Sequence, residues 1–159
     1  MPEKIKVALV GLGNCFSGLI QGIEYYSKNP SQKVTGIIHE NLRDYTIHDI
    51  EFVAGFDVGA NKVGKPINDA IYELPNMVNW IDKNDMPKAN GNVYESPALD
   101  GVGIWVENKV KPIESGKSES ELREEIIKVL KETGVEIIVS YLPVGSEKAT
   151  QFWAQVCLD

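Results

Sequence analysis

The stretch from Lys4 to Ile23 constrains the fold more than any other part of the sequence. Residues 4–10 form a short apolar run rich in β-branched side chains, which is typical of a buried strand, and Gly11-Leu12-Gly13 ends that run. From Asn14 to about Tyr26 the spacing predicts a helix, because apolar residues recur on one face at Phe16, Leu19, Ile20 and Ile23. The stretch therefore predicts a strand, a glycine turn and a helix in succession.

A glycine turn between a strand and a helix is typical of a nucleotide phosphate site. Gly11 permits the tight turn, and Gly13 has no Cβ, so a pyrophosphate can approach the backbone and the positive end of the helix dipole. The third glycine of the usual G-x-G-x-x-G pattern is replaced by Phe16, whose ring we expect to pack inward. The alternative is a plain glycine turn. We favour the phosphate site because the turn follows a clean strand at the start of the chain.

Residues 51–57, which read EFVAGFD, predict a second strand with Asp57 at its carboxyl end. In a dinucleotide fold, the acidic residue at this position accepts hydrogen bonds from the adenosine ribose hydroxyls. Asp57 lies further from the glycines than the roughly 20 residues of the usual pattern, because residues 32–50 intervene. An aspartate that only opens the following turn is the alternative. The strand-end position favours the ribose role.

The rest of the chain continues to alternate strands with helices. We expect a short strand at 34–39, a helix at 68–73 capped by Asn68, a strand at 92–95, an exposed segment at 105–113, a helix at 118–133, a strand at 135–141 and a helix at 147–158 capped by Ser146. Ser118 and Glu121 form a capping box, and Gly134 stands where a C′ glycine belongs. Loops 96–103 and 140–146 should border a cofactor crevice.

This alternation predicts the α/β class, with a Rossmann-like, doubly wound parallel sheet. The last helix carries an apolar stripe, and no further strand follows it. We therefore expect a sheet that is incomplete at the C-terminus, with an open edge and with Phe152, Trp153 and Val156 left uncovered.

Composition narrows the classes of partner. A length of 159 residues favours one domain, and a net charge of −7 argues against nucleic acid or an anionic membrane as the main partner. No apolar run approaches the roughly 20 residues of a membrane-spanning helix, and the start of the chain has no signal-peptide core. Cys15 and Cys157 fit two reduced thiols of a cytoplasmic protein. His39 and His48 have no usual ligand spacing, so a surface loop is favoured over a metal site.

Four segments together resemble the myo-inositol-1-phosphate synthase (inositol-3-phosphate synthase) family, in its bacterial and archaeal branch. They are GLGNCFSGLIQGIEYY, EFVAGFDVGANKVGKPINDAIY, ALDGVG and SYLPVGSEKATQFWAQ. The family pattern does not keep the third glycine, and it carries an insertion before the second strand. The combination of G-x-G-N-C, E-Y-Y and S-Y-L-P-V-G-S is not that of a generic dinucleotide-binding sequence.

The resemblance implies an oligomeric enzyme, an intramolecular lyase or isomerase, that converts D-glucose 6-phosphate to myo-inositol phosphate for inositol and phospholipid synthesis. It implies a tightly held NAD that is reduced and then reoxidised, without net redox change. Residues 1–159 would be the NAD-binding domain. In that domain the pyrophosphate would be bordered by Gly11, Gly13, Asn14 and Cys15. The ribose would be held by Asp57. The nicotinamide half would be bordered by Ser140, Tyr141, Leu142 and Pro143.

The same resemblance implies that the catalytic lysines belong to a second domain C-terminal to this sequence. We therefore expect no catalytic residue here, no metal site, and no synthase activity from this chain alone. Two alternatives remain open. The chain could be the nucleotide-binding half of another NAD(P)-dependent dehydrogenase, which the S-Y-L-P-V-G-S segment disfavours. It could also be a non-catalytic NAD-binding or sensing module.

Overall fold

The computed structural model describes residues 3–28, 36–103 and 107–159. Within them, four strands form one parallel sheet in the order β3-β2-β1-β4. The strands are Ile5–Val10 (β1), Ile50–Asp57 (β2), Asn92–Glu95 (β3) and Ile137–Ser140 (β4). The predicted α/β class and Rossmann-like parallel sheet are confirmed.

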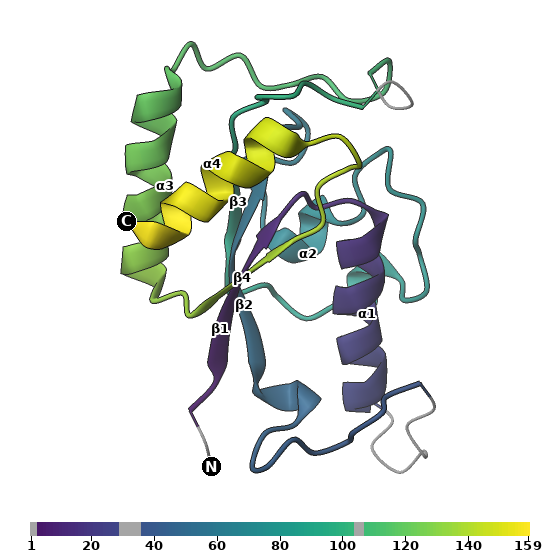
Figure 1. The fold of residues 1–159 in the computed structure, drawn as a ribbon. Helices are drawn as coiled ribbons and strands as arrows, with labels where there is room; N and C mark the ends of the chain where they lie inside the picture. The colour runs from purple at the N-terminus through teal and green to yellow at the C-terminus, as the bar shows by residue number, and fades with distance from the viewer. Residues whose placement is uncertain (1–2, 29–35, 104–106) are drawn as a thin grey trace.

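Helices cover both faces of this sheet (Figure 1). One face packs against α1 (Asn14–Lys28) and α2 (Ile67–Ala70), and the other packs against α3 (Glu119–Thr133) and α4 (Glu147–Leu158). Two short 3₁₀ helices, Ile47–Asp49 (η1) and Lys83–Asp85 (η2), lie in connections. The chain changes face between β3 and α3, so the winding direction reverses between the neighbouring strands β1 and β4.

The central strand β1 supplies both layers of the core. Its side chains alternate between the faces, as the two-residue period of a strand requires. Val7 and Leu9 join the cluster under α1 and α2, whereas Ala8 and Val10 join the cluster under α3 and α4. Because all four residues are buried, the continuous apolar run seen in the sequence is what a strand covered on both sides needs.

The inward face of α1 differs in part from the helical stripe expected from the sequence. Phe16 and Ile20 are buried as predicted, but Leu19 is 37% exposed, and the expectation that it packs inward is wrong. Ser17 and Gln21 are buried instead. The Gln21 Oε1 atom accepts hydrogen bonds from the Trp80 and Ile81 backbone N–H groups, and its Nε2 donates to the Val78 carbonyl. The backbone of residues 78–81 lies against α1 and needs hydrogen-bond partners, which explains why a polar side chain of the helix is buried there.

One predicted helix start and two predicted helix caps are corrected, whereas the start of α4 at Glu147 is confirmed. The helix expected at 68–73 spans Ile67–Ala70, and its N-cap is Pro66, while the Asn68 side chain donates to the Pro87 carbonyl. Within the described residues, the Ser146 side chain makes no capping bond to α4. Asp100 accepts from the Ala149 N–H at 2.7 Å instead. The group that caps α4 comes from a distant loop, so local sequence could not identify it.

Other local predictions have mixed outcomes. The Ser118–Glu121 capping box is confirmed, and so is the left-handed C-cap at Gly134. The strand at 92–95 is confirmed with its bounds, and Lys109, Lys111 and Pro112 are exposed as expected. The expected strand at 34–39 is wrong where it can be judged: residue 36 is a turn, residue 38 a bend, and 37 and 39 have no regular structure. Residues 34–35 lie outside the described residues, as does Trp105.

The apolar stripe of the last helix is covered, contrary to expectation. Phe152, Trp153 and Val156 are all buried, and the Trp153 ring packs on Phe56 of β2 with centroids 4.9 Å apart. These side chains pack on the sheet itself, so no additional strand is needed to bury them. The expected open edge is confirmed for the described residues, because β4 is the last strand on its side and Ile137 is 47% exposed. The helices in the described part of the chain fall short of the length and hydrophobicity that a membrane-spanning helix requires.

Candidate functional site

A cleft lies at the carboxyl ends of the strands, where the winding reverses between β1 and β4. Its cavity volume is about 290 Å³, and it is bordered by the turns after β1 and β2 and by the loops after β3 and β4. Ligands of doubly wound sheets occupy this position. Of the described residues that the sequence assigned to a cofactor, Ser140 alone does not line the cleft. The others do: Gly11, Gly13, Asn14, Cys15, Asp57, Tyr141, Leu142 and Pro143.

The glycine turn has the backbone geometry that its sequence predicts. Gly11 has a φ of +82°, and a Cβ there would lie 3.2 Å from the Tyr141 carbonyl oxygen, so a side chain is disfavoured. A Cβ on Gly13 would meet no described atom within 4 Å. The backbone at Gly13, the residue before α1, therefore has free space beside it, which is the requirement for close approach of an anion to the helix N-terminus.

Asp57 ties the ends of β1 and β2 together. Its Oδ2 accepts from the Leu12 N–H at 2.8 Å, and its Oδ1 accepts from the Gly59 N–H at 2.8 Å. Asp57 therefore both opens the turn after β2 and contacts the glycine turn after β1. A carboxylate offers about four acceptor positions, so capacity remains for hydroxyl groups of a ligand in the cleft.

Lys62 and Asn76 are lining residues that sequence reasoning missed. The Lys62 side chain is buried, and its Nζ donates to the Leu12 carbonyl at 2.7 Å. The Asn76 Nδ2 donates to the same carbonyl at 2.9 Å. Nothing in the local sequence separates Lys62 from Lys65, whose half-buried side chain pairs with Glu73. Burial of Lys62 depends on groups distant in the chain.

Asn14 links the mouth of the cleft to the segment that covers α1. Its Oδ1 accepts from the Met77 N–H at 2.7 Å. The two N–H donors of the same carboxamide are not consumed by that bond. Cys15 is exposed beside it, at the second position of α1. The first turn of the helix therefore presents backbone and side-chain donors toward the cleft.

The loop after β3 borders the cleft as predicted. Residues 96–103 all line it, and the Ser96 N–H donates to the Asp57 carbonyl at 3.0 Å. Asp100 holds the loop to the start of α4 through the Ala149 N–H. Each of the four strand ends therefore contributes one wall of the cleft.

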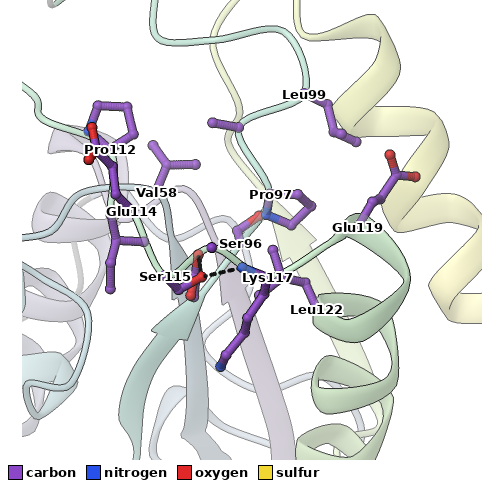
Figure 2. Close-up of a pocket in the computed structure, with 14 residues that line it drawn as sticks. Val58, Ser96, Pro97, Leu99, Pro112, Glu114, Ser115, Lys117, Glu119 and Leu122 are labelled. Atoms are coloured by element: carbon purple, nitrogen blue, oxygen red, sulfur yellow. Dashed lines mark hydrogen bonds between the residues drawn. The ribbon is translucent and has the colours of Figure 1, made fainter.

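A second cavity, of about 270 Å³, adjoins the cleft across Val58 and residues 96–99 (Figure 2). Its wall carries three carboxylates, from Glu95, Glu114 and Glu119. The Ser115 hydroxyl donates to Glu95 Oε1 at 2.8 Å, and this bond joins residues 112–117 to the end of β3. The hydrogen bond from Lys117 to Glu125 raises the pKa of the Lys117 ammonium.

The two histidines lie away from the cleft lining. His39 is exposed, and the His48 Nδ1 lies 3.1 Å from the Ser27 hydroxyl. Among the described residues, no three histidine, cysteine, aspartate or glutamate side chains are grouped as a metal ion would require.

No family model matches the sequence, but several known proteins are similar to it along nearly its whole length. The chain is 41% identical over 157 residues to the inositol-3-phosphate synthase of Mycolicibacterium smegmatis, a match that covers 98% of this chain. The same enzyme of Corynebacterium glutamicum is 41% identical over 161 residues, and that of Mycobacterium tuberculosis is 40% identical over 157 residues. The chain spans 41% of the length of these curated relatives.

Solved structures share the fold. The crystal structure of Ari2 aligns with a TM-score of 0.77 at 27% identity, covering 98% of this chain and 44% of that one. A myo-inositol-1-phosphate synthase-related protein from Thermotoga maritima aligns with a TM-score of 0.74 over the same shares, and its 20% identity supports the fold alone. Along nearly its whole length, this chain is therefore a relative of part of the inositol-3-phosphate synthases, which confirms the resemblance carried by its motifs.

Proposed function

We propose that this chain is the NAD-binding part of an inositol-3-phosphate synthase, an enzyme that converts D-glucose 6-phosphate to 1D-myo-inositol 3-phosphate. The observation that carries the proposal is identity of about 40% to such synthases over 98% of the chain. The position of the cleft, at the reversal of winding between β1 and β4, supports it independently.

The glycine turn and the start of α1 are the proposed pyrophosphate site. The first backbone N–H groups of a helix lack intrahelical acceptors, and the helix dipole favours an anion there. Gly13 leaves open space at this end, and Asn14 and Cys15 border it. These features fit a dinucleotide, because its two phosphates need donors but little protein volume.

Asp57 is the proposed ribose acceptor, and Tyr141, Leu142 and Pro143 are proposed to border the nicotinamide half. The Tyr141 ring packs on Phe16 with centroids 4.4 Å apart, so the first helix holds this wall of the cleft. When bound, NAD would take a hydride from the sugar and later return it, so that no net oxidation results. The role of this chain is to hold and orient the cofactor and to exclude water from one side.

The ring-closing chemistry needs further groups, which we propose come from the rest of a longer protein. An aldol closure requires positive charge at the developing enolate and a grip on the substrate phosphate. Among the described residues, Lys62 is the one cationic side chain that lines the cleft, and its ammonium already contacts Leu12 and Asn76. We also propose that this longer protein is a homo-oligomer of the cytoplasm.

Two measurements on the purified chain test the proposal. Isothermal titration with NAD should show saturable binding to one site, and NADP should bind more weakly. A synthase assay with glucose 6-phosphate and NAD should give no turnover with the 159-residue chain, and turnover with a version extended by the remaining domain of a relative.

The outcomes separate the alternatives. Turnover by this chain alone would place the catalytic residues within this sequence and contradict the proposal that they lie in the rest of a longer protein. Tight NAD binding without activity in any extended version would favour a non-catalytic NAD-binding module. Absence of NAD binding to either version would reject the proposed function.

A further inference from the structure

The residue in the middle of the glycine turn has both of its backbone groups held by side chains. The Leu12 N–H donates to Asp57 Oδ2 at 2.8 Å. The Leu12 carbonyl accepts from Lys62 Nζ at 2.7 Å and from Asn76 Nδ2 at 2.9 Å. Lys62 Nζ also lies 3.3 Å from Asn76 Oδ1 and 3.7 Å from Asp57 Oδ2. A four-residue network of Leu12, Asp57, Lys62 and Asn76 therefore underlies the turn.

The three side chains of this network are buried. Lys62, Asn76 and Asp57 are 4%, 7% and 8% exposed. Removing an ammonium and a carboxylate from water is costly, and a buried ion pair often gives no more stability than apolar residues of similar volume. Stability alone is therefore a weak reason for placing a lysine beneath the turn. A role in the cleft above the turn is a stronger reason.

We propose that Lys62 is a positioning and specificity-determining residue of the dinucleotide site. It holds the turn through the Leu12 carbonyl, and it offsets the negative charge of Asp57. This inference rests on the proposed function, because it takes the cleft to bind NAD, and it adds a role for a residue that need not touch the cofactor.

The positioning part follows from the geometry of the peptide group. The peptide bond between Leu12 and Gly13 is planar, so a fixed carbonyl oxygen also fixes the plane that contains the Gly13 N–H. The Gly13 N–H donates to the Gly11 carbonyl at 2.8 Å, and the Gly13 carbonyl accepts from the Ser17 N–H at 3.0 Å, the first hydrogen bond of α1. By fixing the plane between these two bonds, Lys62 and Asn76 hold the turn that leads into α1, and so they set the orientation of the helix N-terminus.

The specificity part follows from charge. A carboxylate at the end of β2 repels the 2′-phosphate that distinguishes NADP from NAD, and no arginine follows Asp57 in residues 58–65 to pair with it. An ammonium 3.7 Å from Asp57 Oδ2 opposes that repulsion in a site shielded from water. Lys62 should therefore make the preference for NAD smaller than Asp57 alone would impose.

Three variants of the full chain separate the two roles. Lys62→Met removes the charge and one donor but retains an unbranched side chain. Asn76→Ala removes the neutral donor to the same carbonyl and leaves the ammonium in place. Lys65→Met is the matched control, because Lys65 lies on the same loop but its side chain is 41% exposed and pairs with Glu73. Thermal unfolding checks that each variant is folded.

Dissociation constants for NAD and NADP are measured by isothermal titration. We expect Lys62→Met and Asn76→Ala each to weaken NAD binding about tenfold, the equivalent of about one hydrogen bond. Lys62→Met should also raise the ratio of the NADP to the NAD dissociation constant by roughly three- to tenfold, since like charges then meet without compensation. Asn76→Ala and Lys65→Met should leave that ratio unchanged.

Amide hydrogen exchange of Leu12 gives a readout that needs no cofactor. In Lys62→Met the Leu12 amide should exchange at least tenfold faster than in the parent, whereas the central β1 amides should not change. If Lys62→Met does not fold, Lys62→Arg replaces it, and this variant should keep the parent ratio of dissociation constants.

The results that overturn the inference differ from those that overturn the proposed function. A parent that binds NAD, with Lys62→Met matching it in affinity, ratio and exchange, refutes the role of Lys62 and leaves NAD binding intact. Equal weakening of NAD and NADP refutes the specificity part. A parent that binds neither cofactor refutes the proposed function and the specificity part together, and unchanged Leu12 exchange then refutes positioning.

Discussion

Phe16 stands where a dinucleotide fingerprint usually has its third glycine, and its replacement by alanine should destabilise the fold more than the cofactor contacts. The side chain is 0% exposed and packs in the cluster between β1, α1 and α2. It also contacts Tyr141, which lines the cleft, with ring centroids 4.4 Å apart. The ring thus joins the first helix to the loop after β4.

The expected loss follows from these contacts. Truncating a fully buried phenylalanine to alanine costs about 3–5 kcal/mol, because the transfer energy of the ring is lost and a cavity remains. Tyr141 is about half exposed and can move inward, which lets the cavity collapse in part. The lower half of that range, about 3–4 kcal/mol, is therefore expected.

Urea unfolding followed by circular dichroism measures this loss. With a slope of about 2 kcal/mol per molar urea, the midpoint of Phe16→Ala should fall by roughly 1.5–2 M. Leu19→Ala is the matched control on the same helix. Leu19 is 37% exposed, so its midpoint should fall by well under half as much.

Two results would refute the packing argument. An unchanged midpoint for Phe16→Ala would mean that the ring is not part of the core. Loss of NAD binding in a variant that unfolds like the parent would mean that Phe16 acts on the cofactor directly rather than through packing.

Three further predictions concern single groups. Asp57→Ala should weaken NAD binding at least tenfold, because an acceptor and the tie to the glycine turn are both lost; unchanged affinity in a titration would remove Asp57 from the site. Ser118→Ala should cost about 1 kcal/mol in urea unfolding at neutral pH through loss of the cap. Hydrogen bonds from Ser118 lower the pKa of Glu121, so the stability contributed by this carboxylate is present above the ordinary glutamate pKa of about 4.3 and is lost as pH falls through the lowered value. The difference between parent and variant should therefore shrink in acid, and a constant difference would contradict it. Cys15 lines the cleft and Cys157 does not, so mass spectrometry should find that NAD slows alkylation of Cys15 only; equal rates with and without NAD would contradict the pyrophosphate assignment.

Local sequence was sufficient for the framework of this fold. The apolar run, the glycines and the change from a two-residue to a 3.6-residue period located β1, the turn and α1, because each signal acts within one element. The capping box of α3 was predictable for the same reason: Ser118 and Glu121 lie within one helical turn. Parallel strands with their carboxyl ends at one edge then implied where a ligand cleft would lie.

Other features of the framework depended on distant partners. The cap of α4 comes from Asp100, on the loop after β3. Gln21 is buried because the backbone of residues 78–81 lies against α1 and needs hydrogen-bond partners. Trp153 is covered because α4 packs back on β2. In each case the helical pattern shows which side chains could face inward but not which polar groups will meet them there.

The lysines after β2 show most clearly what tertiary structure decides. Lys62 and Lys65 are equivalent in composition and lie on one turn, yet Lys62 is buried beneath the glycine turn, whereas Lys65 pairs with Glu73 at the surface. Local sequence determined the strand, the turn, the helix and the acidic end of β2. The folded chain decided which lysine joins them, because the oxygen that receives its ammonium belongs to a residue 50 positions away. An ammonium can remain buried only where such an acceptor is already in place.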